Sequence, residues 1–176
     1  IQAMEAEGFK IDAVTIQNEP LNRGNSMSLY MTWQEQRDFV KSALGPAFEK
    51  AGIKTKILVY DHNYNYDEDK AENFDQKQYP LKIYEDADAA KYIDGAAFHA
   101  YGGDKEELLK IHNSRPDKNL YFTEMSIGLW GEGYSFAKDL MWNMREVCIG
   151  TINNYNKAVI MWNYMLDDKH GPDRPG

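Results

Sequence analysis

Short apolar segments recur along this chain at the spacing of a repeating strand–helix unit. Five of them are expected to be strands, at residues 13–17, 56–60, 95–99, 120–123 and 158–162. They are β-branched or aliphatic on both faces, which is typical of parallel sheets covered by helices. Successive strand ends lie roughly 24 to 43 residues apart, a βα-unit spacing. The pattern predicts an α/β fold with five parallel strands.

The segments between these strands carry helix signals. Thr32 and Glu35 have the spacing of a capping box, and the helix that they begin is expected to end at Gly52. Further helices are expected at residues 80–93 and 105–112. A longer apolar stripe at helical spacing runs from residue 136 to 152. It includes Cys148, the single cysteine, which excludes an internal disulfide and is expected to be a small core residue.

The number of strand–helix units leaves two architectures open. An eight-stranded barrel usually needs about 250 residues, and this chain has 176. It is therefore either an open doubly wound sheet or the back part of a barrel. No glycine-rich phosphate turn follows any of the strands, which argues against a nucleotide-dependent oxidoreductase on an open sheet. The ends, at Ile1 without a methionine and in a turn-rich tail, are expected to be interior cuts of a longer protein.

The charge balance narrows the class of partner. The formal net charge of −8 disfavours nucleic acid and anionic membranes, both of which attract lysine and arginine patches. No apolar run approaches the roughly 18–20 residues that a membrane span needs. A neutral substrate such as a sugar is compatible with this surface.

Polar and aromatic side chains follow every expected strand. They are Asn18 and Glu19 after the first strand, Asp61 after the second, His99 and Tyr101 at the third, Glu124 after the fourth, and Trp162 and Asn163 at the fifth. In a barrel these strand ends converge on one rim, where such enzymes carry their chemistry. Two glutamates facing one another across a sugar are the groups that cleave most glycosidic bonds. The sequence therefore predicts a site around Glu19 and Glu124.

Each of these residues also has a plainer interpretation. Glu19 stands before a proline and alone would fit the start of a turn, while Glu124 alone would fit a salt-bridged acid at a strand edge. Their occurrence together at corresponding strand ends favours catalysis. We expect His99 to orient a carboxylate and Tyr101 to donate to one. Trp162 fits a core residue as well as it fits a sugar platform.

Several ordered motifs together resemble glycoside hydrolase family 30, over essentially the whole chain. The motifs are Val14-Thr15-Ile16-Gln17-Asn18-Glu19-Pro20, Glu35-Gln36-Arg37-Asp38-Phe39, Leu44-Gly45-Pro46, Ala89-Ala90-Lys91-Tyr92, the strand end with His99, and Phe122-Thr123-Glu124. This family includes glucosylceramidases and β-1,6-glucanases. The resemblance implies a (β/α)8 TIM barrel, of which residues 1–176 supply about strands 4 to 8 as a partial catalytic domain. The front of the barrel and the family's β-sandwich are not represented, so the rest of the parent chain is expected to be needed to close the barrel.

The resemblance also implies roles for individual residues. Glu19 becomes the general acid/base and Glu124 the nucleophile of a retaining β-glycosidase. Asn18 is expected to bind the sugar 2-hydroxyl. The other residues that the resemblance implies at the substrate site are His99, Tyr101 and Trp162, and also Asn163 and Asp61. We expect burial and the nearby acid to raise the pKa of Glu19, and a hydroxyl or imidazole donor to keep Glu124 ionised.

The substrate expected from the resemblance is a β-glucoside. The run Asn22-Arg23-Gly24-Asn25 and the loop at 61–79 favour β-1,6-linked glucan or β-gluco-oligosaccharides. A glucosylceramide-type substrate, or a fragment that binds carbohydrate without cleaving it, remains an alternative. The mechanism needs no metal and no cofactor, and Asp61 with His62 lacks the third ligand of a metal motif. Secretion or a periplasmic location is expected from the family.

Overall fold

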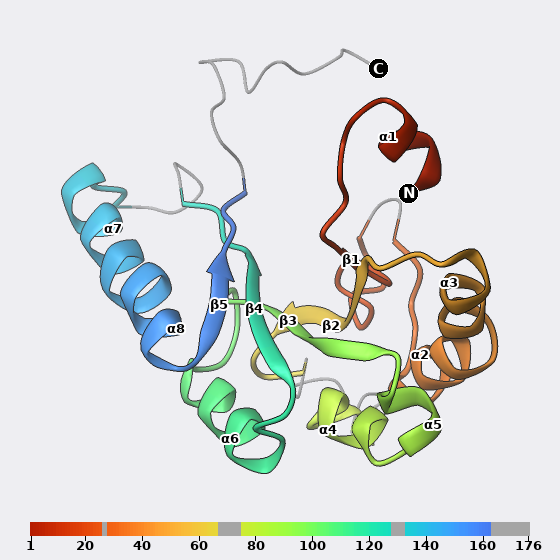
Figure 1. Ribbon diagram of the computed structural model, residues 1–176. Helices are drawn as coiled ribbons and strands as arrows, with labels where there is room; N and C mark the ends of the chain where they lie inside the picture. Colours follow the sequence, from red (N-terminus) through yellow and green to blue (C-terminus); the bar gives the residue numbers. More distant parts are fainter. Residues whose placement is uncertain (26–27, 67–74, 128–132, 163–176) are drawn as a thin grey trace.

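The chain forms a single curved sheet of five parallel strands. The computed structural model describes residues 1–25, 28–66, 75–127 and 133–162. The strands run side by side in chain order: β1 (Ala13–Thr15), β2 (Lys56–Asn63), β3 (Ile93–His99), β4 (Asn119–Glu124) and β5 (Asn156–Val159). Figure 1 shows the sheet curling with the main helices along its outer side. The five parallel strands predicted from the sequence are confirmed, and β1 and β5 are the two edges of the sheet.

The helices fill the intervals between the strands. After α1 (Gln2–Ala6), the first interval holds α2 (Trp33–Phe39), a π-helical segment η1 (Val40–Leu44) and α3 (Gly45–Ala51). The later intervals hold α4 (Tyr79–Tyr84) with α5 (Ala87–Ala90), α6 (Glu106–Ser114), and finally α7 (Phe136–Trp142), η3 (Asn143–Ile149) and α8 (Gly150–Asn153). None of the helices in the described ranges is both long and apolar enough for a membrane crossing.

The predicted ends of the first long helix are confirmed by their caps. The Glu35 N–H donates to Thr32 Oγ1 at 3.3 Å, and the Thr32 N–H donates to Glu35 Oε2 at 2.8 Å. This reciprocal pair satisfies two backbone donors that a helix start leaves free. At the other end Gly52 adopts a left-handed conformation with φ of 68°, which costs glycine little. The local sequence therefore fixes where this helix begins and ends.

The helix expected over residues 80–93 is divided into α4 and α5. The carboxylate of Asp86 accepts hydrogen bonds from the N–H groups of Asp88 at 3.0 Å and Ala89 at 3.2 Å, and so caps a new helix. A side chain that bonds to the backbone in this way competes with a continuous helix. As a result α5 is short and β3 begins at Ile93, earlier than expected.

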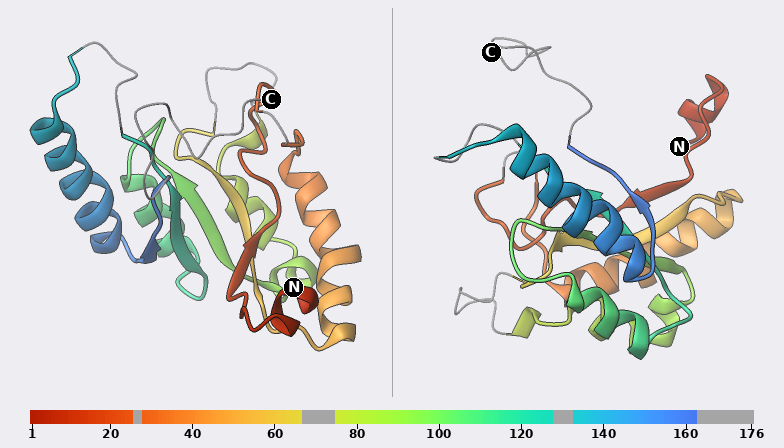
Figure 2. Two further views of the ribbon diagram at one scale, coloured as in Figure 1. Left: turned by 90° about the horizontal axis from the view of Figure 1, so that it is seen from above. Right: turned by 90° about the vertical axis from the view of Figure 1, so that its left-hand side faces the viewer.

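The apolar stripe from residue 136 to 152 is less buried than the sequence suggests. Val147 is buried, and Cys148 is half-buried. Phe136 and Met141, in contrast, are 69% and 63% exposed. Figure 2 shows this helical segment beside β5, at one end of the sheet. Because β5 is an edge strand, the described residues offer the outer part of the stripe no further strand to pack against.

A bulge in β2 gives the sheet its main irregularity. The register between β2 and β3 shifts between Tyr60 and His62, and the two consecutive residues Tyr60 and Asp61 have φ of 74° and 70°. Left-handed backbone is unusual for residues with a side chain and needs compensating contacts. Gln36, which is fully buried on α2, provides one by accepting the Tyr60 N–H at 2.8 Å. The bulge turns Asp61 toward the neighbouring strand ends.

Candidate active site

Most of the residues predicted from the strand ends do gather in one place. A cavity of about 310 Å³ is lined by polar side chains from the segments of four neighbouring strands: Asn18, Asp61, His99, Thr123 and Glu124. Apolar residues, among them Val14 and Leu58, form other parts of its wall. The strand ends therefore converge as they do in a barrel.

Glu19 is held by both its backbone and its side chain. Its φ is 48°, and its N–H donates to the Asp61 carbonyl at 2.9 Å. Its Oε2 accepts from the side-chain amides of Asn22 at 2.9 Å and Asn25 at 3.2 Å. Its Oε1 lies 3.2 Å from His99 Nδ1. The carboxylate is thus fixed in one orientation, with only 12% of its side chain exposed.

His99 lies between two carboxylates at the end of β3. Its Nδ1 faces Glu19, and its Nε2 lies 3.1 Å from Asp61 Oδ1. Asp61 in turn accepts the hydroxyls of Thr15 at 2.7 Å and Thr123 at 2.6 Å. The expectation that His99 orients a carboxylate is confirmed by these contacts, and His99 reaches two of them.

Glu124 closes the other side of the site. Its Oε1 accepts the Tyr101 hydroxyl at 3.2 Å, which confirms the expected donation from Tyr101 to a carboxylate. Tyr101 is positioned by its own N–H, which donates to Asn63 Oδ1 at 3.0 Å. One carboxylate oxygen of Glu124, one of Glu19 and a ring nitrogen of His99 all lie within 4.8 Å of one another. The two glutamates therefore face each other across a short gap.

The protons are distributed differently from the sequence-based expectation. The hydrogen bond from His99, opposed by burial and assisted by Asn22, lowers the pKa of Glu19 from 4.5 to about 2. Burial raises the pKa of Glu124 above 4.5, although His99 and Tyr101 act against that rise. The expected raised pKa of Glu19 is therefore wrong for the free site. The physical reason is the positive charge on His99, which stabilises ionised Glu19.

His99 carries that charge despite its burial. Burial alone would lower the pKa of an imidazole, but the hydrogen bonds with Asp61 and Glu19 raise the pKa of His99 from 6.5 to about 9. Burial also acts to raise the pKa of Asp61, yet His99 and the two threonine hydroxyls lower it below its ordinary value. The free site thus holds charged groups of both signs in contact.

The remaining predicted residues lie at the margin of this cluster. Asn18 is exposed and lines the cavity. Trp162 is 60% exposed, and its N–H donates to the Met125 carbonyl at 3.0 Å, which places its backbone beside the residue after Glu124. Asn163 lies outside the described residues. Asp61 lines the cavity but is only 5% exposed, and its oxygens are occupied by other protein groups.

Sequence reasoning missed several residues that act on the site. Asn22 and Asn25 bind Glu19, Thr15 and Thr123 bind Asp61, and Gln36 supports the bulge. A hydroxyl within each of two otherwise apolar strands was the available signal for the threonines. The two asparagines give no such signal, because their contact with Glu19 depends on the path of the loop.

The same cluster is the place where a metal would have to bind. Glu19, His99 and Glu124 offer ligand atoms within 4.8 Å of one another. Coordination requires a deprotonated imidazole nitrogen, whereas both ring nitrogens of His99 already face carboxylates. Hydrogen bonding therefore accounts for this arrangement without a metal ligand role.

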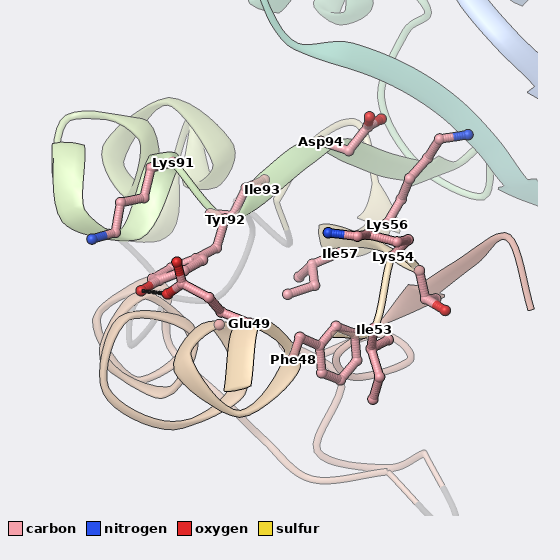
Figure 3. Close-up of a pocket in the computed structure, with 12 residues that line it drawn as sticks. Phe48, Glu49, Ile53, Lys54, Lys56, Ile57, Lys91, Tyr92, Ile93 and Asp94 are labelled. Carbon is pink, nitrogen blue, oxygen red and sulfur yellow. Dashed lines mark hydrogen bonds between the residues drawn. The ribbon is translucent and has the colours of Figure 1, made fainter. Parts of the chain in front are cut away.

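A larger cavity lies elsewhere and does not include the predicted site residues. It measures about 540 Å³ and is lined by residues around the starts of β2 and β3, including Lys54, Lys56 and Lys91. Figure 3 shows these lysines around it, together with the hydrogen bond from the Tyr92 hydroxyl to Glu49, at 3.3 Å. Parallel-sheet enzymes carry their chemistry at the opposite, carboxyl ends of the strands. Size alone therefore does not identify the site.

Known proteins are similar to this chain in both fold and sequence. The solved structure of the endo-β1,6-glucanase BT3312 is 61% identical, with a TM-score of 0.92 over 100% of this chain and 38% of that one. An endo-1,6-β-D-glucanase of Neurospora crassa is 33% identical over 100% of this chain and 34% of its own length. A putative glucosylceramidase 2 of Caenorhabditis elegans is 28% identical over 98% of this chain and 33% of its own length.

The chain thus spans about a third of the length of the curated relatives that it matches. The curved sheet of five parallel strands agrees with a fragment of a TIM barrel, as expected from the sequence. Residues 1–174 match the model of the glycosyl hydrolase family 30 TIM-barrel domain. The chain therefore belongs to glycosyl hydrolase family 30.

Proposed function

We propose that this chain is the part of a retaining β-glycosidase that carries both catalytic glutamates. The observation that carries the proposal is the short gap between Glu19 and Glu124, with carboxylate oxygens within 4.8 Å of each other. Retaining enzymes hold their carboxyl groups about 5–5.5 Å apart, while inverting enzymes leave about 6.5–9.5 Å for a water. The separation favours direct attack on the sugar by one glutamate.

In this proposal Glu124 is the nucleophile and Glu19 the acid/base. An oxygen of Glu124 attacks the anomeric carbon while protonated Glu19 gives its proton to the departing glycosidic oxygen. Water then attacks the same carbon, Glu19 accepts a proton from it, and the bond to Glu124 breaks. The Tyr101 hydroxyl, 3.2 Å from Glu124, stabilises the carboxylate before attack and after release.

The proposed substrate is β-1,6-linked glucan or a β-gluco-oligosaccharide. The names of BT3312 and of the Neurospora crassa relative support this linkage. Similarity to a putative glucosylceramidase keeps a glucosylceramide-type β-glucoside as the second candidate. Product analysis on gentio-oligosaccharides, an aryl β-glucoside and a lipid β-glucoside, with the full-length protein, separates the two. Preferential cleavage of the lipid glucoside would contradict the glucan assignment.

Paired glycine variants test the roles of the two glutamates. In Glu124→Gly, hydrolysis should be abolished, and azide should enter the vacated face of an activated β-glucoside to give the α-glycosyl azide. In Glu19→Gly, Glu124 still forms the covalent intermediate, and azide should attack it to give the β-glycosyl azide. Exchange of the two products between the variants would show that the roles are reversed. Unimpaired turnover by Glu124→Gly, or sugar binding without hydrolysis by the wild type, would refute the proposed function.

A further inference from the structure

One buried carboxylate joins the segments of four strands behind the two glutamates. Asp61 on β2 accepts the hydroxyl of Thr15 on β1 at Oδ2, and the hydroxyl of Thr123 on β4 at Oδ1. Its Oδ1 also faces His99 Nε2 on β3. Asp61 is only 5% exposed. A carboxylate so far from water requires donors and a compensating positive charge, and His99 is the partner in position to supply that charge.

The hydrogen-bond partners determine the protonation of His99. Ionised Asp61 can only accept hydrogen bonds, so His99 Nε2 must carry a hydrogen. At the other ring nitrogen, Nδ1 faces Glu19 Oε1, and the two asparagine amides that donate to Oε2 favour ionised Glu19. Both ring nitrogens are therefore donors, which makes His99 an imidazolium. The raised pKa of His99, about 9, is consistent with this assignment.

The groups that face His99 favour its positive charge in sum. They come from the loop after β1, from β2, from the segment after β3 and from β4, and they are Glu19, Asp61, His62, Tyr101 and Glu124. Three of the five are carboxyl groups. The ring of His62 is 6.4 Å away and that of Tyr101 is 6.2 Å away. Three carboxyl groups therefore favour the positive charge of His99, against one other imidazole.

We propose that Asp61 is a positioning residue that keeps His99 as an imidazolium, from which Glu19 receives the proton for the leaving group. This inference rests on the proposed function. It explains how an acid can be ionised in the free site and still protonate a glycosidic oxygen. The proton is held on His99 Nδ1, 3.2 Å from Glu19 Oε1, and passes to Glu19 as Glu19 protonates the leaving group.

The protons balance over the two steps. In the first, Nδ1 of His99 transfers its proton to Glu19, Glu19 protonates the glycosidic oxygen, the bond from that oxygen to the anomeric carbon breaks, and Glu124 bonds to that carbon. His99 is then neutral. In the second, water attacks the carbon, its proton passes to Glu19, the bond to Glu124 breaks, and Glu19 returns the proton to His99. One water is consumed and the starting charges are restored.

Substrates with different leaving groups test this inference in the full-length protein. A gentio-oligosaccharide has a poor leaving group, so its cleavage needs the general acid. 2,4-Dinitrophenyl β-glucoside has a good leaving group, which departs without protonation. Asp61→Asn keeps the shape and removes the charge. We expect kcat/KM for the oligosaccharide to fall about 100-fold, the size of a general-acid effect, and for the dinitrophenyl substrate less than about 5-fold. The difference should widen as pH rises toward 9, because His99 of the variant loses its proton at lower pH than His99 of the wild type.

Two further variants serve as controls. Asp61→Glu keeps the charge and is expected to preserve most of the ratio between the two substrates. Asp94→Asn removes a carboxylate from the beginning of β3, where it accepts from Asn119 at 3.0 Å and Tyr121 at 2.7 Å, away from the site. It should leave the ratio unchanged. Equal losses on both substrates in Asp61→Asn would mean a merely structural role and would overturn the proposal.

A readout without turnover separates this inference from the proposed function. The His99 ring can be titrated by NMR in the free protein, and in Asp61→Asn it should lose its proton at a pH at least about one unit lower. An unchanged His99 titration would overturn the proposal. If the wild type cleaves neither substrate while the titration still moves, the proposed function fails and the effect of Asp61 on His99 is supported.

Discussion

Glu19 and Asp61 are linked twice, once through their backbones and once through a shared histidine. The Glu19 N–H donates to the Asp61 carbonyl at 2.9 Å, and His99 lies 3.2 Å from one carboxylate and 3.1 Å from the other. Both residues have left-handed backbone, with φ of 48° and 70°. A change in the β2 bulge therefore reaches Glu19 by two routes.

Gln36→Leu should weaken the bulge from a distance. The substitution leaves the buried Tyr60 N–H without its acceptor, so we expect the free energy of unfolding to fall by about 1–3 kcal/mol. Denaturant titration measures this. Gln34→Leu on the same helix is the control, because its amide donates to Asp75 at 3.0 Å in an exposed setting and accepts a long hydrogen bond from Gln76 at 3.4 Å. Its loss should change the free energy by less than about 1 kcal/mol. Equal effects of the two substitutions would contradict the role given to Gln36.

Tyr101→Phe should make Glu124 harder to ionise. Its hydroxyl donates to Glu124 and opposes the rise that burial causes in the pKa of that carboxyl. The acidic limb of the kcat/KM profile reports ionisation of the nucleophile in the free enzyme, so it should move to higher pH. Tyr155→Phe removes a hydroxyl from a ring that stacks on His112 and should leave the limb in place. A shift to lower pH in Tyr101→Phe would be inconsistent with this account.

Stability should decline at both ends of the pH range. Folding raises the pKa of His99 from 6.5 to about 9, so its contribution is complete below 6.5 and is lost as pH rises through 9. Folding lowers the pKa of Glu19 from 4.5 to about 2, so its contribution is complete above 4.5 and is lost as pH falls through 2. For one proton the slope between pH 6.5 and 9 is at most about 1.4 kcal/mol per pH unit.

Urea unfolding over pH 2 to 10 measures these two declines. In Asp61→Asn the loss contributed by His99 should still begin near pH 6.5, but it should end at lower pH and be smaller, because His99 in the folded variant gives up its proton sooner. His112→Gln is the control, since His112 stacks on Tyr155 away from the carboxylates, and the decline should persist in this variant. If the alkaline decline in stability disappeared in His112→Gln, its attribution to His99 would be wrong.

Gly95→Ala should be severely destabilising for a different reason. A Cβ on Gly95 would lie 1.9 Å from the Asn119 carbonyl oxygen, so β3 and β4 would have to separate. We expect a loss of about 3 kcal/mol or more, the upper range for overpacking. Gly24→Ala is the control, because its Cβ would make only an ordinary contact with Asn22 at 3.5 Å. Thermal or denaturant unfolding of the two variants distinguishes them, and similar stabilities would contradict the steric argument.

The sequence predicts best what depends on neighbouring residues. The capping box of Thr32 and Glu35 and the left-handed Gly52 are local devices, and both were predicted in place. The apolar strands were also recognised from their own composition. The end of β2 was not, because Asp61 and His62 read as loop residues, although both are buried within the strand. The burial of Asp61 depends on Thr15, His99 and Thr123, which come from three other strands.

The charges of the site show the same division. The presence of Glu19 and Glu124 follows from strand-end patterns, and so does their proximity once the strands are parallel. The order of their pKa values does not, because it depends on which member of a coupled group holds the proton. That member is His99, whose charge requires Asp61, and Asp61 requires hydroxyls from two further strands. Because these contacts join residues from several strands, no single segment of the sequence indicates them.

The bulge in β2 has a consequence for how this sequence can change. Side chains alternate between the faces of a strand, and an extra residue resets the alternation beyond it. Deleting one residue between 57 and 60 would leave β2 an apolar strand and yet exchange the directions of Asp61 and His62. The length of β2 is therefore constrained by the site residues that it carries. An insertion here is compatible with the site only if it restores the same alternation of side chains.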